Sequence, residues 1–479
     1  MERKRISRRA FLQLAGTGLA GSIIAACAPS APAPAPTQQP AKQAEQKPAA
    51  TDAPKQAPAA AGGKEFVMWG LEYDPHVEAY KRIAAAFEKK TGYKANIQPQ
   101  AWPLETKLLA AISAGTQPDV VCVMGIVSLP LFMQKAVIEM DDVVYKAAGV
   151  DPQKFFFPEA IQAYTWNGRT MGVPLESNQV SQAVATRYDY LDEAGDKAKA
   201  LWPGLNVKTE PAGFDSYETM WALAEMLQKK QGGTVTRWGM SSQGWDLGQF
   251  FSLMYDFDKF FWDSTNQKFV IDSPEGVKAM QLYAETPVKR GIETQLDQTH
   301  MDALLASKVA VAKGNTSMAP EGAKLKLADG TPMKVEQVMS PPGIPGKEPK
   351  FVGEGGWGWE IPTRAKQRDI AIEFAKWMAT REGQLEYVPI YGGVVPSTPS
   401  VLDDPIYQGD DLVKRSKRRA IASLKNTVYY GNEWGLNRTG AVVPFDEVRQ
   451  GVKTAAEAVK ALQEIMTVNY QQWKASTKS

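Results

Sequence analysis

The residue types that carry out most catalysis are scarce in this chain of 479 residues. It contains two histidines, His76 and His300, and two cysteines, Cys27 and Cys122. His76 falls on the apolar stripe of an expected helix, which favours a structural imidazole over a general base. Cys122 lies in the apolar run VVCVM, where a thiol packs as a small hydrophobic side chain. These four residues lack the spacing of a zinc site, so we expect no metal and no cofactor.

Paired carboxylates are the remaining route to catalysis, because two of them can hydrolyse a glycosidic bond. The acidic candidates are Glu72, Glu176, Asp256, Asp258, Glu354 and Glu360. Nothing in their spacing brings two of them to one bond, and the chain has no nucleophile elbow and no P-loop. The sequence therefore predicts a protein that is not an enzyme, with a glycan hydrolase kept as an alternative.

A glycine-rich stretch, residues 353–358 (GEGGWG), matches the dinucleotide pattern G-x-G-x-x-G. A dinucleotide site requires a helix that begins at the third glycine. A strand-like segment halted by Pro362 follows instead, so we interpret the stretch as a hinge that carries Trp357. Tryptophan rings pack on the C–H faces of pyranose rings, and a few polar groups beside them hold a small polar ligand.

The elements that would position these side chains alternate between strand and helix. We expect strands at 65–70, 93–97 and 120–124, and helices that end at Gly92 and Gly115. Continuous apolar strands such as 120–124 are typical of parallel sheets covered on both faces. The sequence therefore predicts an α/β fold.

Turn and cap patterns mark the later elements. The pair Asn167-Gly168 predicts a type I′ hairpin, and residues 454–457 (TAAE) predict a capping box before a long final helix. Residues 215–218 (DSYE) predict another capping box, which begins a helix to Lys230 that two glycines at 232–233 end. The densest basic run, 414–419, is interpreted as a solvated helix face. With a net charge of +2 and no basic block with interleaved aromatics, nucleic acid is not expected as a partner.

The first 27 residues have a basic start, a short apolar stretch and small residues, as export signals do. Residues 7–12 (SRRAFL) resemble the twin-arginine signal. Residues 24–27 (IAAC) resemble a lipobox, in which Cys27 is lipidated after cleavage. Residues 28–63 are Ala- and Pro-rich and are expected to form a disordered tether. We therefore expect an exported protein anchored by lipid to the outer face of the cytoplasmic membrane.

Six segments of the globular region resemble, in order, the extracellular solute-binding protein family 1 of ABC importers, which includes maltose-binding protein. The segments are 66–70 (FVMWG), 84–92 (AAAFEKKTG), 114–121 (AGTQPDVV), 168–176 (GRTMGVPLE), 355–362 (GGWGWEIP) and 395–402 (VPSTPSVL). The resemblance implies a two-lobed periplasmic-binding-protein-like fold of class II, with ligand in the cleft and hinge closure around it.

The resemblance also implies lobe boundaries and partners. We expect an N-terminal lobe from 64–176 and 312–360 and a C-terminal lobe from 177–311 and 361–479. The crossing segments are expected at 176–178, 309–312 and 359–361. The expected partners are a carbohydrate, mono- or oligosaccharide, and the transmembrane subunits of an ABC permease; the protein itself is expected to be a monomer. A non-sugar solute is kept as an alternative.

The ligand-binding residues that the resemblance implies come from strand ends and crossings. They are Trp69, Glu72, Glu176, Asn178, Asn315 and Trp357. Trp245 is added because it is the central residue of a Gly-Trp-Asp sequence that is expected to form a loop.

Overall fold

The structure is a computed structural model. It describes residues 65–178, 182–205, 213–244, 246–314, 316–388, 395–429, 431 and 440–476. The expected signal, Cys27 and the tether lie outside these residues. The described chain belongs to one compact unit, Gly62–Ser479. Within the described residues, no helix combines the length and the apolar composition that a bilayer span requires.

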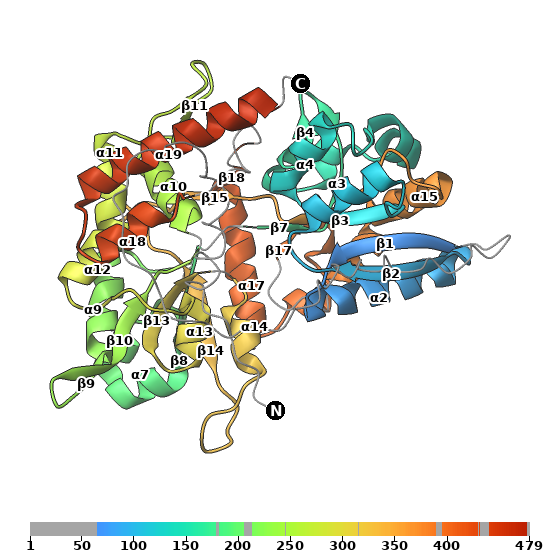
Figure 1. Ribbon diagram of the computed structural model, residues 1–479. Coiled ribbons are helices and arrows are strands. Elements are labelled where there is room, and N and C mark those ends of the chain that lie inside the picture. Colours follow the sequence, from blue (N-terminus) through green and yellow to red (C-terminus); the bar gives the residue numbers. More distant parts are fainter. Residues whose placement is uncertain are drawn as a thin grey trace, which may run out of the picture. The chain divides into compact units, whose positions relative to one another are not determined.

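The first lobe is built on a five-stranded sheet (Figure 1). In spatial order its strands are β2 (Lys94–Gln100), β1 (Glu65–Leu71), β3 (Val120–Met124), β16 (Trp357–Glu360) and β6 (Val173–Pro174). β1 is parallel to β2 and β3, and β16 is antiparallel to β3 and β6. Every residue of β3 is buried, as expected for a central strand with helices on both faces.

Helices from two distant parts of the chain cover this sheet. They are α2 (Asp74–Thr91), α3 (Leu104–Ala114), α4 (Gly125–Met133), the π-helix η1 (Asp141–Lys146), α5 (Pro152–Phe155), α6 (Pro158–Gln162), α15 (Arg368–Met378) and α16 (Arg381–Tyr387). Phe374 of α15 lies 5.5 Å from Phe66 and 5.3 Å from Phe87, ring centre to ring centre. Residues 361–388 therefore complete the core of the first lobe.

The second lobe is built on another five-stranded sheet. Its strands are β14 (Val335–Met339), β8 (Ala183–Arg187), β13 (Val309–Gly314), β10 (Thr234–Ser241) and β9 (Lys229–Gln231). β8 is antiparallel to β13 and β14, whereas β10 is parallel to β13. The carboxyl ends of β10, β13 and β14 therefore meet at one edge, beside the amino end of β8.

The helices of the second lobe surround this sheet (Figure 1). They are α7 (Tyr188–Ala194), α8 (Asp196–Leu201), η2 (Pro203–Leu205), α9 (Tyr217–Leu227), α10 (Asp246–Asp256), α11 (Pro274–Met280), η3 (Gln281–Glu285), α12 (Thr286–Lys289), α13 (His300–Leu305), α14 (Met318–Ala323), α17 (Leu412–Ser423), η6 (Leu424–Asn426), α18 (Val443–Arg449) and α19 (Ala455–Ser476). Short hairpins and turns complete the two lobes: β4 (Thr165–Trp166) with β5 (Arg169–Thr170), β11 (Trp262–Asp263) with β12 (Lys268–Phe269), η4 (Pro399–Val401) and η5 (Pro405–Tyr407).

The chain passes between the lobes three times, after β6, after β14 and after α16. Two small ladders accompany these passages. One pairs β7 (Glu176–Ser177) with β17 (Val395–Pro396), and the other pairs β15 (Phe351–Gly353) with β18 (Thr427–Tyr429). The first passage, between β6 and β8, runs through β7, Glu176–Ser177.

The other two expected crossings are wrong. Residues 309–312 belong to β13, in the middle of the second sheet, and 359–361 begin within β16 of the first sheet. The lobe boundaries expected at 312 and 361 shift accordingly: 312–314 and 335–339 pair in the second sheet, and 361–388 pack on the first lobe. A short apolar strand inside a sheet and an apolar segment between lobes have the same composition, so the sequence alone did not separate them.

The local patterns mostly fold as expected. Asn167 and Gly168 have φ angles of 48° and 73° in the β4–β5 turn, and Thr454 exchanges hydrogen bonds with Glu457 at the start of α19. The expected helix to Lys230 is wrong: α9 ends at Leu227, and the two glycines at 232–233 form the turn between β9 and β10.

The basic run 414–419 is not a solvated face, which corrects the sequence interpretation. Arg415, Lys417 and Arg419 of α17 are 5%, 5% and 2% exposed. Arg415 and Arg419 both contact Oε1 of the fully buried Glu336 in β14, at 2.8 and 3.0 Å. The acid that Arg415 and Arg419 share lies some eighty residues away in the chain, and no local pattern reveals such a partner.

Candidate functional site

The carboxyl edge of the first sheet gathers most of the expected site residues. β1 ends at Leu71, just before Glu72, and β2 ends at Gln100, two residues before Trp102. The N–H of Glu72 donates to the carbonyl oxygen of Gln100 (2.8 Å), which ties the two loops together. In α/β sheets, ligands bind outside the carboxyl ends of the strands. We define this set of loops, together with the crossing segments that meet it, as the candidate site.

The crossing segments reach the same edge because β16 runs antiparallel to β3. Trp357, at the amino end of β16, pairs with Met124, at the carboxyl end of β3. The N–H of Gly125 donates to the carbonyl oxygen of Gly356 (2.7 Å). The glycine hinge before Trp357 and the first crossing after β6 therefore both lie at this edge.

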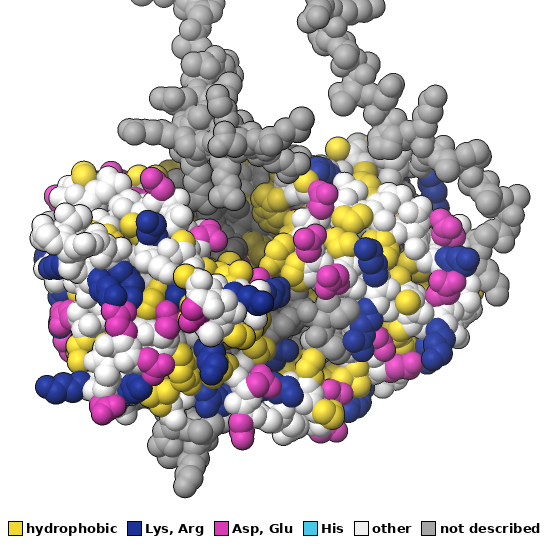
Figure 2. All heavy atoms as spheres, turned by 90° about the horizontal axis from the view of Figure 1, so that it is seen from below, with side chains coloured by type: hydrophobic (Ala, Val, Ile, Leu, Met, Phe, Trp, Pro, Cys, Tyr) yellow, Lys and Arg dark blue, Asp and Glu magenta, His cyan; other side chains and the backbone are white. Residues whose placement is uncertain are grey.

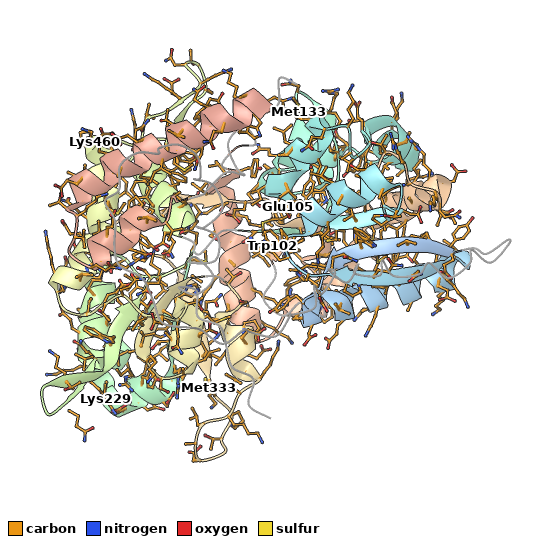
Figure 3. All side chains as sticks on the ribbon, viewed as in Figure 1. Trp102, Glu105, Met133, Lys229, Met333 and Lys460 are labelled. Carbon is orange, nitrogen blue, oxygen red and sulfur yellow. The ribbon has the colours of Figure 1, made fainter. Side chains whose placement is uncertain are left out.

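Two aromatic side chains project from the edge, and the sequence analysis did not select either of them. Tyr73 is 41% exposed, and Trp102, at 56%, is the one tryptophan with an exposed side chain among the described residues. Figure 3 shows Trp102 and Glu105 at the same margin of the first lobe. An aromatic residue two positions after a strand that ends at a carboxyl edge was the signal that could have found them.

Glu176 and Asn178, from the first crossing, come together with the hinge. The hydroxyl of Tyr387 donates to Oε2 of Glu176 (2.9 Å), and burial raises the pKa of Glu176 to about 8. Gly356, at φ 61°, lies so close to Glu176 that a Cβ there would come within 2.4 Å of the Glu176 carbonyl oxygen. The carbonyl oxygen of half-buried Asn178 accepts from the N–H of Glu354 (2.9 Å).

Two more buried carboxyl groups stand beside the hinge. Oε1 of Glu159 accepts from the N–H of Gly355 (2.6 Å), and Oε1 of Glu360 accepts from the hydroxyl of Ser128. Burial raises the pKa of both glutamates to about 8. A pKa of about 8 favours the protonated, uncharged form of these two carboxyl groups at neutral pH.

Trp357 lies in the core rather than in an open loop. It is 6% exposed, and its ring centre is 5.0 Å from that of His76. His76 is itself buried, and burial lowers its pKa to about 3, which agrees with the structural role expected for it. Contact between Trp357 and a ligand stays a prediction.

Trp69 and Glu72 occupy the first strand and its end. Trp69 is half-buried, and its Nε1 donates to Oε1 of Gln98 on β2 (3.0 Å). Glu72 is exposed. The structure brings both to the candidate site, with Glu72 free to reach a ligand and Trp69 turned toward its neighbour strand.

The other acidic candidates do not form a catalytic pair. Asp256 accepts from the N–H groups of Gly343 and Lys350, and Asp258 forms an ion pair with Lys350. Both lie at the end of α10 in the second lobe, whereas Glu360 is fully buried in the first. Among the described residues, no group of three or more His, Cys, Asp or Glu side chains is placed to hold a metal ion.

The second lobe offers the matching carboxyl edge. The N–H of Ser340, after β14, donates to the carbonyl oxygen of Gln182, just before β8 (2.7 Å). The crossings after β6 and β14 thus leave one carboxyl edge and enter the other. Trp245 and Asn315 lie outside the described residues; of the glycines that precede them in the chain, Gly244 lies three residues after β10 and Gly314 is the last residue of β13.

His300 packs at this second edge, between Gln243 and Gly314. The imidazole Nδ1 lies 2.7 Å from the carbonyl oxygen of Gln243, and because a carbonyl only accepts, Nδ1 carries the proton. A Cβ on Gly314 would overlap the ring at 1.8 Å, so glycine is required where β13 ends. Burial lowers the pKa of His300, which makes it a structural residue rather than a base.

Comparison with known proteins gives the class. The profile of the bacterial extracellular solute-binding proteins matches residues 82–415, well over half of the chain, and the chain belongs to this family. The fold agrees with this: it is the two-lobed α/β fold of periplasmic binding proteins. No curated protein sequence matches the chain.

Several solved structures with a similar fold are binding proteins described with sugars. The sugar-binding protein MalE from Xanthomonas citri has a TM-score of 0.67 and 17% identity, over 87% of this chain and 99% of its own. The ABC substrate-binding protein Lmo0181 from Listeria monocytogenes, in complex with cycloalternan, has a TM-score of 0.66 and 17% identity; the match covers 84% of this chain and 97% of that protein. The ABC transporter associated binding protein from B. animalis subsp. lactis Bl-04, in complex with β-1,6-galactobiose, has a TM-score of 0.62 and 17% identity; the match covers 86% of this chain and 98% of that protein.

Proposed function

We propose that this protein is the carbohydrate receptor of an ABC importer. It captures a mono- or oligosaccharide between the two carboxyl edges, closes around it by a hinge motion, and delivers it to the permease. The observation that carries the proposal is the exposed pair Tyr73 and Trp102 at the carboxyl edge of the first sheet, in a chain of the solute-binding family. Aromatic faces flanked by few polar groups suit a sugar ring.

The buried carboxyl groups beside the glycine hinge are compatible with a neutral ligand. Glu159 and Glu176 carry raised pKa values of about 8, so they hydrogen-bond without imposing a full negative charge at neutral pH. On the face that Figure 2 shows, basic and acidic side chains are interspersed, with no field of one sign that would favour an ionic solute.

The location and the partners form the finer part of the proposal. Cys27 anchors the protein by lipid outside the cytoplasmic membrane after twin-arginine export, the Pro-rich tether gives it reach, and it works as a monomer beside the transmembrane subunits. It catalyses no reaction. Two alternatives remain to be tested: a receptor for a non-sugar solute, and a glycan hydrolase.

The test is a thermal-shift and calorimetric panel on the full chain. The carbohydrates are maltotetraose, β-1,6-galactobiose and tagatose; the other solutes are spermidine, a tripeptide and glycerol 3-phosphate. A ligand present at 100 times its dissociation constant stabilises the folded state by about 2.7 kcal/mol. We expect at least one carbohydrate to raise the Tm and none of the other solutes to do so.

Two outcomes would overturn the proposal. If spermidine, the peptide or the phosphate ester raises the Tm and no carbohydrate does, the solute class is wrong. If chromatography of the incubated oligosaccharides shows cleavage at an enzymatic rate, the protein is a hydrolase.

A further inference from the structure

The second crossing contains a very short link between the two lobes. Before the link, the N–H of Val352 donates to Oγ of Ser252 on α10 of the second lobe (3.0 Å). After it, the carbonyl oxygen of Gly356 accepts from the N–H of Gly125, directly after β3 in the first lobe (2.7 Å). Residues 353–355, which we call the link, therefore lie between an anchor in one lobe and an anchor in the other.

The backbone of the link is suited to rotation. Gly355 and the adjacent Gly356 have φ angles of 81° and 61°. Glycine adopts positive and negative φ angles at similar cost, and a few residues absorb the φ and ψ changes of a hinge motion. A rotation of the second lobe against the first therefore turns the peptide groups of the link.

Helix α6 of the first lobe places a buried carboxyl group on this link. Oε1 of Glu159 accepts from the N–H of Gly355 at 2.6 Å. A Cβ on Gly353 would come within 2.2 Å of the same oxygen, and a Cβ on Gly355 within 2.0 Å of the Cβ of Ala163. Glu159 therefore fixes the direction of one peptide N–H in the link, and α6 fills the space beside it.

The same part of the first lobe contacts the other two crossings. The N–H of Phe157 donates to the carbonyl oxygen of Ser397 in the third crossing (2.8 Å). Burial raises the pKa of Glu159 to about 8, and Ser177 and the Asn178 backbone of the first crossing lie beside the carboxyl group and act in the opposite direction. Glu159 therefore stands where the first and second crossings meet.

The described conformation leaves the aromatic faces of the candidate site open to solvent. Tyr73 and Trp102 are both exposed. A conformation closed around a ligand buries most of the ligand surface and the side chains that contact it. The described conformation is therefore the open one, and the hydrogen bond between Glu159 and Gly355 belongs to it.

We propose that Glu159 is a positioning residue that holds the link in the open conformation and thereby lowers the affinity for solute. Closure around a solute rests on the proposed function, and the role of Glu159 is added to it. Closing carries residues 351–353 with the second lobe and turns the N–H of Gly355 away from the carboxyl group. The apparent Kd is the Kd of the closed conformation divided by the closed fraction, so a bond that lowers this fraction raises the Kd by the same factor.

The size of the effect follows from one hydrogen bond. A net intramolecular hydrogen bond shifts an equilibrium by about threefold to tenfold. Glu159→Met removes the acceptor and keeps an unbranched side chain of similar length, so the closed fraction should rise by about threefold to tenfold. Glu159→Gln retains a carbonyl oxygen as acceptor and should behave as the wild type does.

Asp119→Leu is the matched control. Asp119 is also a buried acid that accepts backbone N–H groups, those of Val67 (2.8 Å) and Gln367 (2.7 Å), but all of these residues belong to the first lobe. Its substitution should lower the Tm and leave the closed fraction and the Kd unchanged. A role of Glu159 in stability alone would give the same pattern for Glu159→Met.

Single-molecule fluorescence energy transfer on the full chain, without solute, measures the closed fraction. The dyes are attached to cysteines at Met133 on α4 and Met226 on α9, two exposed positions on different lobes. Cys27→Ala leaves the buried Cys122 as the one native thiol. The population with the minor distance should grow in Glu159→Met. Equal distributions in Glu159→Met and the wild type, or the same growth in Asp119→Leu, would overturn the proposal.

The solute arm uses maltotetraose, or whichever panel carbohydrate raises the Tm most. Its Kd should fall by about threefold to tenfold in Glu159→Met and stay constant in Glu159→Gln and Asp119→Leu. An unchanged or higher Kd in Glu159→Met would overturn the proposal. If no panel carbohydrate binds, the proposed function fails, while the distance distributions still decide on Glu159.

One measurement on the wild-type protein requires no variant to fold. Saturating carbohydrate should lower the protection of the Gly355 N–H against hydrogen exchange, because closure breaks its bond to Glu159. Unchanged or increased protection would show that the bond persists in the closed conformation, which would overturn the proposal.

Discussion

Replacing Trp102 by alanine tests the candidate site, and the exposed area of this side chain sets the expected loss of affinity. Trp102 is 56% exposed. A tryptophan side chain buries up to ~250 Å² when covered completely, so roughly 140 Å² is open to a ligand. A sugar ring that covers half of this removes ~70 Å² from water, worth ~1.8 kcal/mol at ~25 cal/mol per Å². The Kd for a bound carbohydrate should therefore rise ~20-fold.

The assay is isothermal titration of wild type, Trp102→Ala and Trp102→Phe with the panel carbohydrate that binds. Trp102→Phe keeps an aromatic face and should lose less affinity. The control is Met226→Ala. Met226 lies on α9 and is 40% exposed, and its substitution should leave the Kd as in the wild type. An unchanged Kd in Trp102→Ala, with an unchanged Tm, would refute the placement of the site at this edge.

Four further changes test other parts of the molecule. Trp357→Ala should lower the free energy of unfolding by ~3–5 kcal/mol, because this tryptophan is 6% exposed. The folded-state pKa of Glu176, about 8, exceeds the ordinary value of 4.5. The free energy of unfolding of the wild type should therefore fall by on the order of 4 kcal/mol from pH 4.5 to pH 8. Glu176→Gln should lack this fall, so its stability relative to the wild type should increase as pH rises. Glu336→Ala should cost ~3–5 kcal/mol, since it leaves two buried guanidinium groups without their acid. Cys27→Ala should leave carbohydrate affinity intact and move the protein from the membrane to the soluble fraction.

Chemical denaturation across pH, with matched controls, measures the three stability effects. Glu72→Gln, at an exposed position, should not alter the pH dependence that Glu176→Gln removes. Asp142→Ala removes an ion pair in which both side chains are more than four-fifths exposed, and it should change stability by less than ~1 kcal/mol. Equal losses in Asp142→Ala and Glu336→Ala would contradict the importance of burial. Retention of Cys27→Ala in the membrane fraction would contradict the lipid anchor.

The sequence predicted those parts of the fold that depend on local pattern. The first βαβαβ segment, the left-handed glycines at 92 and 115 and the Asn167-Gly168 turn all follow from periodicity and turn chemistry. The fold class follows from the alternation of strand and helix together with the family resemblance.

Long-range pairing is what the sequence did not predict. β16 and β13 are short apolar runs, and only the partner strands decide that one completes the first sheet and the other stands inside the second. The basic run of α17 is buried because it meets Glu336, which lies on a strand of the second sheet. Composition near a residue does not reveal a partner so far along the chain.

The candidate site was predicted in part for the same reason. Glu176, Asn178 and Trp357 came from motifs, and the structure places them together at the first crossing. Trp102 belongs to no motif. It is a candidate because its side chain is exposed near the end of a strand, and this exposure is known only once the sheet is assembled.

The position of β16 also governs how the chain acquires its fold during synthesis. β3 pairs with β16 through Met124 and Trp357, and β6 has β16 as its one neighbour in the sheet. At ~5–20 residues per second, the ribosome delivers Trp357 roughly 10–50 s after Met124. Throughout that interval β3 keeps an unpaired edge, the kind that associates with other chains. A fragment of the first lobe that consists of residues 65–178 would therefore lack β16, the strand that lies between β3 and β6 in the sheet.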